Sequence, residues 1–75
     1  MQNHTEQLLI MEKYIIRNKT IKFADDFNDN LSEYLDVLSN CEIITFNRKS
    51  LFDQPIDFLP DSITHLTFGV YFNQS

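Results

Sequence analysis

The residues able to do covalent or metal chemistry are few in this chain and lie far apart. Cys41 is the single cysteine, and the two histidines, His4 and His65, have no cysteine at the spacing that zinc ligands require. A thiol becomes a useful nucleophile when a histidine is placed to take its proton, yet none lies near Cys41 in the sequence. We therefore interpret Cys41 as a buried structural thiol, and we predict no metal and no cofactor.

The acidic residues form no recognisable catalytic or ion-binding pattern either. The pair Asp25-Asp26 would suggest a calcium loop, but the alternating ligands and the sixth-position glycine of an EF-hand are absent. Asp61-Ser62 completes no hydrolase triad, and no glycine-rich phosphate loop is present. The pattern predicts a protein that is not an enzyme, without catalytic or cofactor-binding residues.

Length and charge narrow the class of protein further. The 75 residues suffice for a single domain, and one cysteine cannot stabilise it through an internal disulfide. The net charge of −5 is uneven, because residues 1–22 hold four basic and two acidic residues whereas residues 23–75 hold two basic and nine acidic ones. An acidic body repels phosphate backbones, so nucleic acid is not an expected partner.

No segment resembles a membrane span or a secretory signal. The apolar run Leu8–Met11 is four residues long, whereas a membrane helix needs roughly 20 apolar residues and a signal peptide about 7–15. With one unpaired cysteine, we expect an intracellular location and no membrane partner.

Three phenylalanines recur at a nearly constant interval and indicate how the chain is built. Phe23, Phe46 and Phe68 are separated by 23 and 22 residues, and each is preceded two positions earlier by isoleucine or leucine. A period in the low twenties is typical of a solenoid of stacked short turns. The fold class predicted is α+β, a short solenoid of about three turns.

The expected elements follow from hydrophobic periodicity and capping residues. Residues 3–17 read as an amphipathic helix that caps the open end of the core, although Tyr14-Ile15-Ile16 alone would also suit a strand. Asn30 and Glu33 form a capping box for a second helix. We therefore expect strands at 20–23, 43–46 and 63–68, a helix at 31–38 and an extended connection at 53–62.

Three short motifs follow one another in the C-terminal third of the chain: Phe52-Asp53-Gln54-Pro55-Ile56, Leu59-Pro60-Asp61-Ser62-Ile63 and Leu66-Thr67-Phe68-Gly69. They resemble the signature Phe-Asn-x-Pro-Ile, Leu-Pro-x-Ser-Ile and Leu-x-Phe-Gly of the FNIP repeat, a leucine-rich-repeat-like unit of social amoebae and of giant viruses that infect amoebae. The resemblance implies that the solenoid is leucine-rich-repeat-like, with an N-terminal helical cap. Asp53 departs from the signature asparagine. A viral source would make the host cytoplasm the expected location.

The resemblance implies a division of the chain and a set of inward-facing residues. Residues 1–75 would form a single domain, with a helical cap at 1–18, two degenerate repeats at 19–51, and one FNIP-like repeat plus the start of another at 52–75. Asn28 and Asn73 would bond the backbone of neighbouring turns, whereas the junction at Asp53 would be weaker or water-bridged. The inward positions would be Ile21, Phe23, Phe27, Cys41, Ile44, Phe46, Phe52, Ile63, Leu66, Phe68 and Phe72.

The function predicted is a non-catalytic protein–protein interaction module. Its partner would bind the strand face, formed by Thr20, Lys22, Ile43, Thr45, His65 and Thr67. A homodimer through the uncapped C-terminal end, at Phe68 and Phe72, is a further expectation. The alternative is a truncated remnant of a longer FNIP repeat protein with no independent activity. The F-box found in some family members does not fit in the residues before the first strand, so no ubiquitin-ligase role is carried over.

Overall fold

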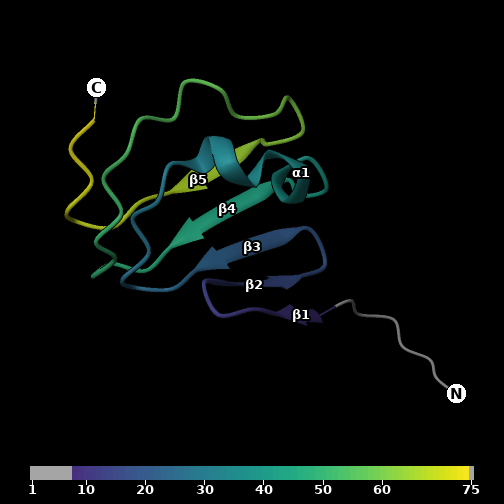
Figure 1. Ribbon diagram of the computed structural model, residues 1–75, viewed down its shortest axis with the longest axis horizontal. Helices are drawn as coiled ribbons and strands as arrows, with labels where there is room; N and C mark the ends of the chain where they lie inside the picture. Colours follow the sequence, from purple (N-terminus) through teal and green to yellow (C-terminus); the bar gives the residue numbers. More distant parts are fainter. Residues whose placement is uncertain (1–7, 75) are drawn as a thin grey trace, which may run out of the picture.

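The computed structural model describes residues 8–74 and contains a mixed five-stranded sheet (Figure 1). The strands follow one another in chain order across the sheet. The first two pairings are antiparallel, and the last two are parallel. A short helical segment, η1 (Leu31–Tyr34) continuing into α1 (Leu35–Leu38), joins β3 to β4. The strands are β1 (Leu8–Ile10), β2 (Tyr14–Arg17), β3 (Thr20–Phe23), β4 (Ile43–Phe46) and β5 (His65–Thr67).

The predicted leucine-rich-repeat-like solenoid with an N-terminal helical cap is wrong. Residues 8–17 form two antiparallel strands, which makes the sheet mixed, and the remainder of the predicted helix lies outside the described residues. Tyr14–Arg17 is rich in β-branched and aromatic residues, which favour strands. Pairing with β2 also satisfies the backbone groups along one edge of β3, which a helix would leave open.

The turn between β2 and β3 fixes the register of this hairpin. Asn18 adopts a left-handed backbone conformation (φ 56°), which asparagine tolerates better than most residues. Tyr14 then lies opposite Phe23, and Ile15 lies opposite Lys22. Because side chains alternate along a strand, Tyr14 faces the core and Ile15 faces away from it.

The three parallel strands are in register, so residues about one interval apart become neighbours. Thr20 lies opposite Ile43, which in turn lies opposite His65. The rings of Phe23, Phe46 and Phe68 stack with centroids 5.2 and 5.8 Å apart. A second column of rings (Phe27, Phe52 and Phe72) has centroid separations of 6.0 and 6.0 Å. The regular spacing of Phe23, Phe46 and Phe68 in the sequence thus corresponds to the first of these columns.

The inward residues predicted for β3, β4 and the segments around them are buried. Buried side chains form one core cluster: Tyr14, Ile21, Phe23, Phe27, Leu31, Leu38, Cys41, Ile44, Phe46 and Phe52. Of the inward residues predicted for the C-terminal part, Ile63, Phe68 and Phe72 pack only partly buried against this cluster, and Leu66 is 38 % exposed. Burial therefore decreases towards β5.

The connections between strands are held by hydrogen bonds that recur along the chain. The carbonyl of Lys19 accepts bonds from the backbone of Glu42 and Ile43, and the carbonyl of Glu42 accepts bonds from Thr64 and His65. The segment expected to be helical at 31–38 is helical, and the Asn30 side chain caps it by accepting a 2.9 Å bond from the Ser32 backbone. Strands were also predicted correctly at 20–23 and 43–46, whereas β5 is shorter than the expected 63–68.

Candidate functional site

The candidate site is the face of the sheet that points away from the core. Thr20, Ile43 and His65 are direct cross-strand neighbours on β3, β4 and β5. Lys22, Thr45 and Thr67 form a second row of neighbours on the same strands. Between the two rows lie Ile21, Ile44 and Leu66, whose side chains point to the other side of the sheet because strand residues alternate. The structure thus brings together all six residues named from the sequence.

Two residues on β2 extend this face and were missed by the sequence reasoning. Ile15 lies opposite Lys22, and Arg17 lies opposite Thr20, so each of the two rows gains a fourth member. They were missed because a helix was predicted for residues 3–17, so these positions were not assigned to a strand. The signal that could have found them is the β-branched run Tyr14-Ile15-Ile16, read with a period of two rather than as a helical stripe. We call the eight positions the open face: Ile15, Arg17, Thr20, Lys22, Ile43, Thr45, His65 and Thr67.

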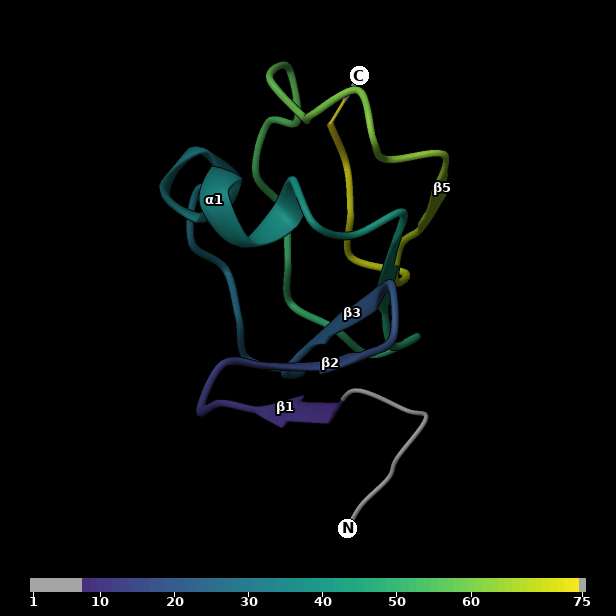
Figure 2. The same ribbon diagram turned by 90° about the vertical axis from the view of Figure 1, so that its right-hand side faces the viewer.

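The open face carries apolar side chains that water contacts. Ile15 is 43 % exposed, and Ile43 is half-buried. Figure 2 shows α1 and the long connection after β4 together on one side of β3, β4 and β5. The core lies on that side, and the open face is on the other. Among the described residues, the helical segment therefore packs on the core side of the sheet and leaves this face open.

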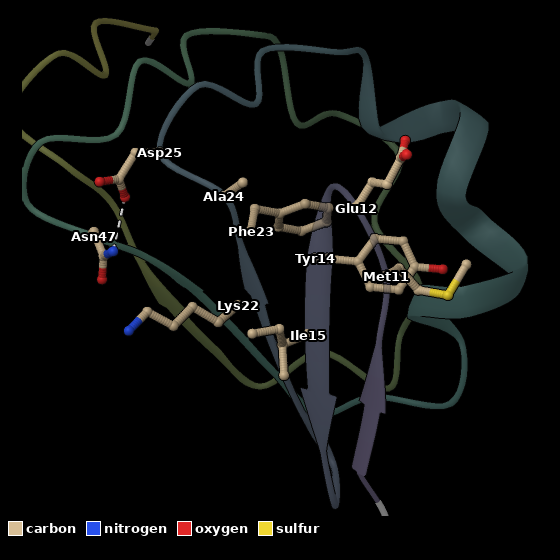
Figure 3. Close-up of a pocket in the computed structure, with 9 residues that line it drawn as sticks. All are labelled: Met11, Glu12, Tyr14, Ile15, Lys22, Phe23, Ala24, Asp25 and Asn47. Carbon is tan, nitrogen blue, oxygen red and sulfur yellow. Dashed lines mark hydrogen bonds between the residues drawn. The ribbon is translucent and has the colours of Figure 1, made fainter.

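Two shallow hollows flank the neighbouring side chains of Ile15 and Lys22. The first, of about 390 Å³, lies towards the β2–β3 turn and is lined by Ile15, Arg17, Asn18, Thr20 and Lys22. The second, of about 320 Å³, lies at the other end of these strands (Figure 3). Its lining adds carboxylates, because it comprises Met11, Glu12, Tyr14, Ile15, Lys22, Phe23, Ala24, Asp25 and Asn47.

The charges of the open face have one sign. Arg17 and Lys22 contribute positive charge, and none of the eight positions is acidic. Lys22 is exposed and forms no ion pair within residues 8–74. The nearby carboxylate of Asp25 instead accepts a 2.7 Å bond from Nδ2 of Asn47, drawn as a dashed line in Figure 3. The face can therefore offer cationic and apolar contacts together.

Cys41 and His65 lie in different environments, and the structure gives them no shared role. Cys41 is buried, burial raises the pKa of its thiol, and its Sγ lies 3.7 Å from the Val37 carbonyl oxygen. A raised pKa disfavours the reactive thiolate, which supports the structural interpretation of this residue. His65 is exposed on the open face, where Nδ1 lies 2.9 Å from the hydroxyl of Thr64.

The described part of the chain holds neither a metal-binding cluster nor a helix that could span a membrane. Within residues 8–74, no three side chains among His, Cys, Asp and Glu gather closely enough to hold a metal ion. The same residues include no helix with the length and apolar character needed to cross a membrane.

Comparison with known proteins finds a family match for the segment that contains the edge strand β5. Residues 52–75 match the family model of the FNIP repeat. The chain therefore contains an FNIP repeat. The FNIP repeat supplies β5, the connection that precedes it and the turn that follows it, whereas β1 to β4 lie before the match. No curated protein and no solved structure matches the chain.

The FNIP repeat thus contributes two of the open-face residues, His65 and Thr67. The other six belong to strands outside the repeat. Their in-register pairing with β5 makes one continuous surface from the repeat and the preceding segment.

Proposed function

We propose that this FNIP repeat-containing protein is a non-catalytic binding module that holds another protein on its open face. The observation that carries the proposal is the uncovered sheet face itself. It presents exposed Ile15, half-buried Ile43 and exposed Lys22 on paired strands. Apolar side chains on a rigid sheet offer a partner buried contact area, and the polar residues around them provide specificity.

The choice of a binding module over an enzyme rests on two observations. The matching family is a repeat rather than an enzyme family. The one thiol of the chain is buried and has a raised pKa, which opposes a nucleophilic role. An intracellular location, inferred from this single unpaired thiol, is part of the proposal.

A panning experiment tests the open face directly. A random dodecapeptide library is selected on the immobilised wild-type chain, and the binders are then measured on two variants. Thr45→Tyr places a bulky neutral side chain in the middle of the open face, between Lys22 and Thr67. Ser32→Tyr makes a similar change at an exposed position of η1, outside the open face.

The proposal predicts binders that lose affinity for Thr45→Tyr and keep it for Ser32→Tyr. Circular dichroism and thermal unfolding confirm that both variants fold. Failure to select any binder, or binders that respond equally to both variants, would contradict the proposal.

The edge formed by β5 is a second candidate surface, and we propose that a second copy of the chain binds there. Leu66 occupies the same core-facing row as Ile21 and Ile44, which are 0 % exposed, yet it is 38 % exposed itself. Phe68 and Phe72 are also only partly covered. An edge strand beside uncovered apolar residues favours association.

Sedimentation velocity over a range of protein concentrations tests this second surface. The expected result is a monomer–dimer equilibrium that Leu66→Lys shifts towards the monomer. Lys49→Glu, in the loop after β4, serves as a control for a general charge effect. A monomer at every concentration would rule the dimer out.

A further inference from the structure

The open face is positively charged, whereas acidic residues outnumber basic ones in the rest of the chain. The whole chain has 11 acidic residues and a net charge of −5, yet none of the eight open-face positions is acidic. Arg17 and Lys22 lie on neighbouring strands, and His65 lies at the far end of the row that contains Arg17. The face is therefore a positive strip on an acidic protein.

The strongest contact site on this strip is the paired Ile15 and Lys22. Ile15 is 43 % exposed and lies directly across from Lys22, which has no ion-pair partner within residues 8–74. The hollow of about 390 Å³ beside them has no carboxylate in its lining, in contrast to the hollow at the other end of the strands. Figure 3 shows both side chains coming from neighbouring strands, close to each other.

We propose that the partner of the open face is an acidic protein segment, with a carboxylate bound to Lys22 and an adjacent apolar side chain packed on Ile15. This inference rests on the proposed function and adds the chemistry of the partner. Charge complementarity carries it, because a carboxylate would meet an unpaired ammonium group without displacing an existing ion pair. The apolar neighbour would cover the isoleucine surface.

Two other occupants fit the observations less well. Nucleic acid would meet the cations of the face, but the body around it is acidic and repels phosphate. A second copy of the chain is proposed to bind at the β5 edge instead, where exposed Leu66 offers apolar contact. A segment of another protein can concentrate its carboxylates at the strip and avoid most of the repulsion from the acidic body.

The peptide binders selected on the wild-type chain provide the probe. We expect their sequences to be enriched in Asp and Glu next to Leu, Ile or Phe. The best binder is then labelled with fluorescein, and its affinity is measured by anisotropy for the wild type, Lys22→Glu, Ile15→Ser and Lys49→Glu. An analogue in which amides replace the acidic residues of the peptide, and a single-stranded oligothymidine, are measured beside it.

The proposal predicts that Lys22→Glu weakens binding by about tenfold, because an attraction becomes a repulsion. Ile15→Ser weakens it by about fivefold, since apolar contact is lost. Lys49→Glu makes the same change in net charge at an exposed loop position and should have less than about a twofold effect. The amide analogue binds weakly, and added salt reduces the affinity of the acidic peptide.

The outcomes separate this inference from the proposed function. Binders that lose affinity for Thr45→Tyr but lack acidic residues, and whose affinity is unchanged by Lys22→Glu, would leave the proposed function standing and overturn the acidic partner. Equal losses of affinity in Lys22→Glu and Lys49→Glu would mean that the change in net charge, and not a contact with Lys22, weakens binding, which would overturn the inference. Tighter binding of oligothymidine, or a dimer abolished by Lys22→Glu, would assign the face to nucleic acid or to a second copy.

Discussion

At the scale of single residues, short polar side chains link each connection to the next. Oδ1 of Asn28 accepts a 2.8 Å bond from the backbone of Asp53, and Oδ1 of Asp53 accepts a 2.9 Å bond from the backbone of Asn73. The expectation of a water-bridged junction at Asp53 is wrong because these bonds are direct, whereas the alternative expectation of a weaker junction stays a prediction. The contact uses a side-chain oxygen as acceptor, and a carboxylate supplies that oxygen as well as an amide does.

Asp53 should make stability depend on pH. Bonds from the Asn73 backbone and from the Gln74 side chain lower the pKa of its carboxyl. Its contribution is therefore complete above the ordinary pKa of aspartate, about 3.9, and is lost as the pH falls through the lowered folded-state value. Urea unfolding from pH 7 down to pH 2 should show a smaller acid loss in Asp53→Asn than in the wild type. Asp57→Asn, on the same connection, is the control, and an unchanged profile for Asp53→Asn would contradict the assignment.

Gly69 is required because backbone atoms approach it closely. A Cβ built there would lie 2.5 Å from the Asn47 carbonyl oxygen and 2.8 Å from that of Arg48. Its φ is not positive, so small size rather than left-handed geometry explains the residue. Gly69→Ala should cost about 1–3 kcal/mol, as overpacking does. Val70→Ala, at an exposed neighbour, should cost under about 0.5 kcal/mol. Urea denaturation measures both, and similar values for the two would contradict the close approach.

At the scale of elements, the hairpin of β1 and β2 covers the end of the core where the sequence pattern predicted a helix. Tyr14 packs edge-on against Phe23 and Tyr34, with centroids 5.9 and 6.1 Å away. The hydroxyl of Tyr34 donates a 2.9 Å bond to Asp29, which also forms an ion pair of 2.8 Å with Lys13. The hairpin is thereby attached to the segment before α1.

The strand register of the hairpin can be tested by neighbouring substitutions. Tyr14→Ala should cost about 2–4 kcal/mol, because a buried aromatic ring is removed from the end of the core. Ile15→Ala should cost under about 1 kcal/mol, since this side chain is 43 % exposed on the open face. Thermal or urea unfolding gives the two values. A larger cost for Ile15 than for Tyr14 would mean that β2 is shifted by one residue.

At the scale of the whole molecule, two aromatic columns run through the core and become less covered towards β5. Phe46 is 2 % exposed and stacks between Phe23 and Phe68, whereas Phe68 is only partly buried. Deleting a ring that has neighbours on both sides removes more van der Waals contacts than deleting a ring at the end of a column. Stability should therefore be unevenly distributed along the molecule.

Matched deletions in one column measure this gradient. Phe46→Ala should cost about 3–5 kcal/mol, and Phe68→Ala about half as much. Amide hydrogen exchange should be slowest in β3 and β4 and faster in β5. Equal costs for the two variants, or the strongest protection in β5, would contradict the gradient.

Parts of the fold and of the candidate site could be predicted because the period of the sequence is strong, although the predicted fold class was wrong. The spacing of Phe23, Phe46 and Phe68 correctly located two of the strands and the residues that stack. The six residues of the predicted strand face lie together for the same reason. The hairpin was missed because Leu8, Met11 and Ile15 also match a helical stripe over so short a segment, and with them Ile15 and Arg17 were missed.

The sequence by itself determined the periodic parts of this protein, namely the strands at 20–23 and 43–46, the helical segment at 31–38 and the FNIP repeat at the C-terminal end. Local spacing and capping suffice for these, because each depends on residues close in the chain. Only the tertiary structure decided that residues 8–17 are strands and that the open face spans four strands. The backbone groups along the edge of β3 need hydrogen-bonding partners, and β2 provides them. A local sequence pattern does not specify this pairing, because it forms only when the two strands meet in the folded chain.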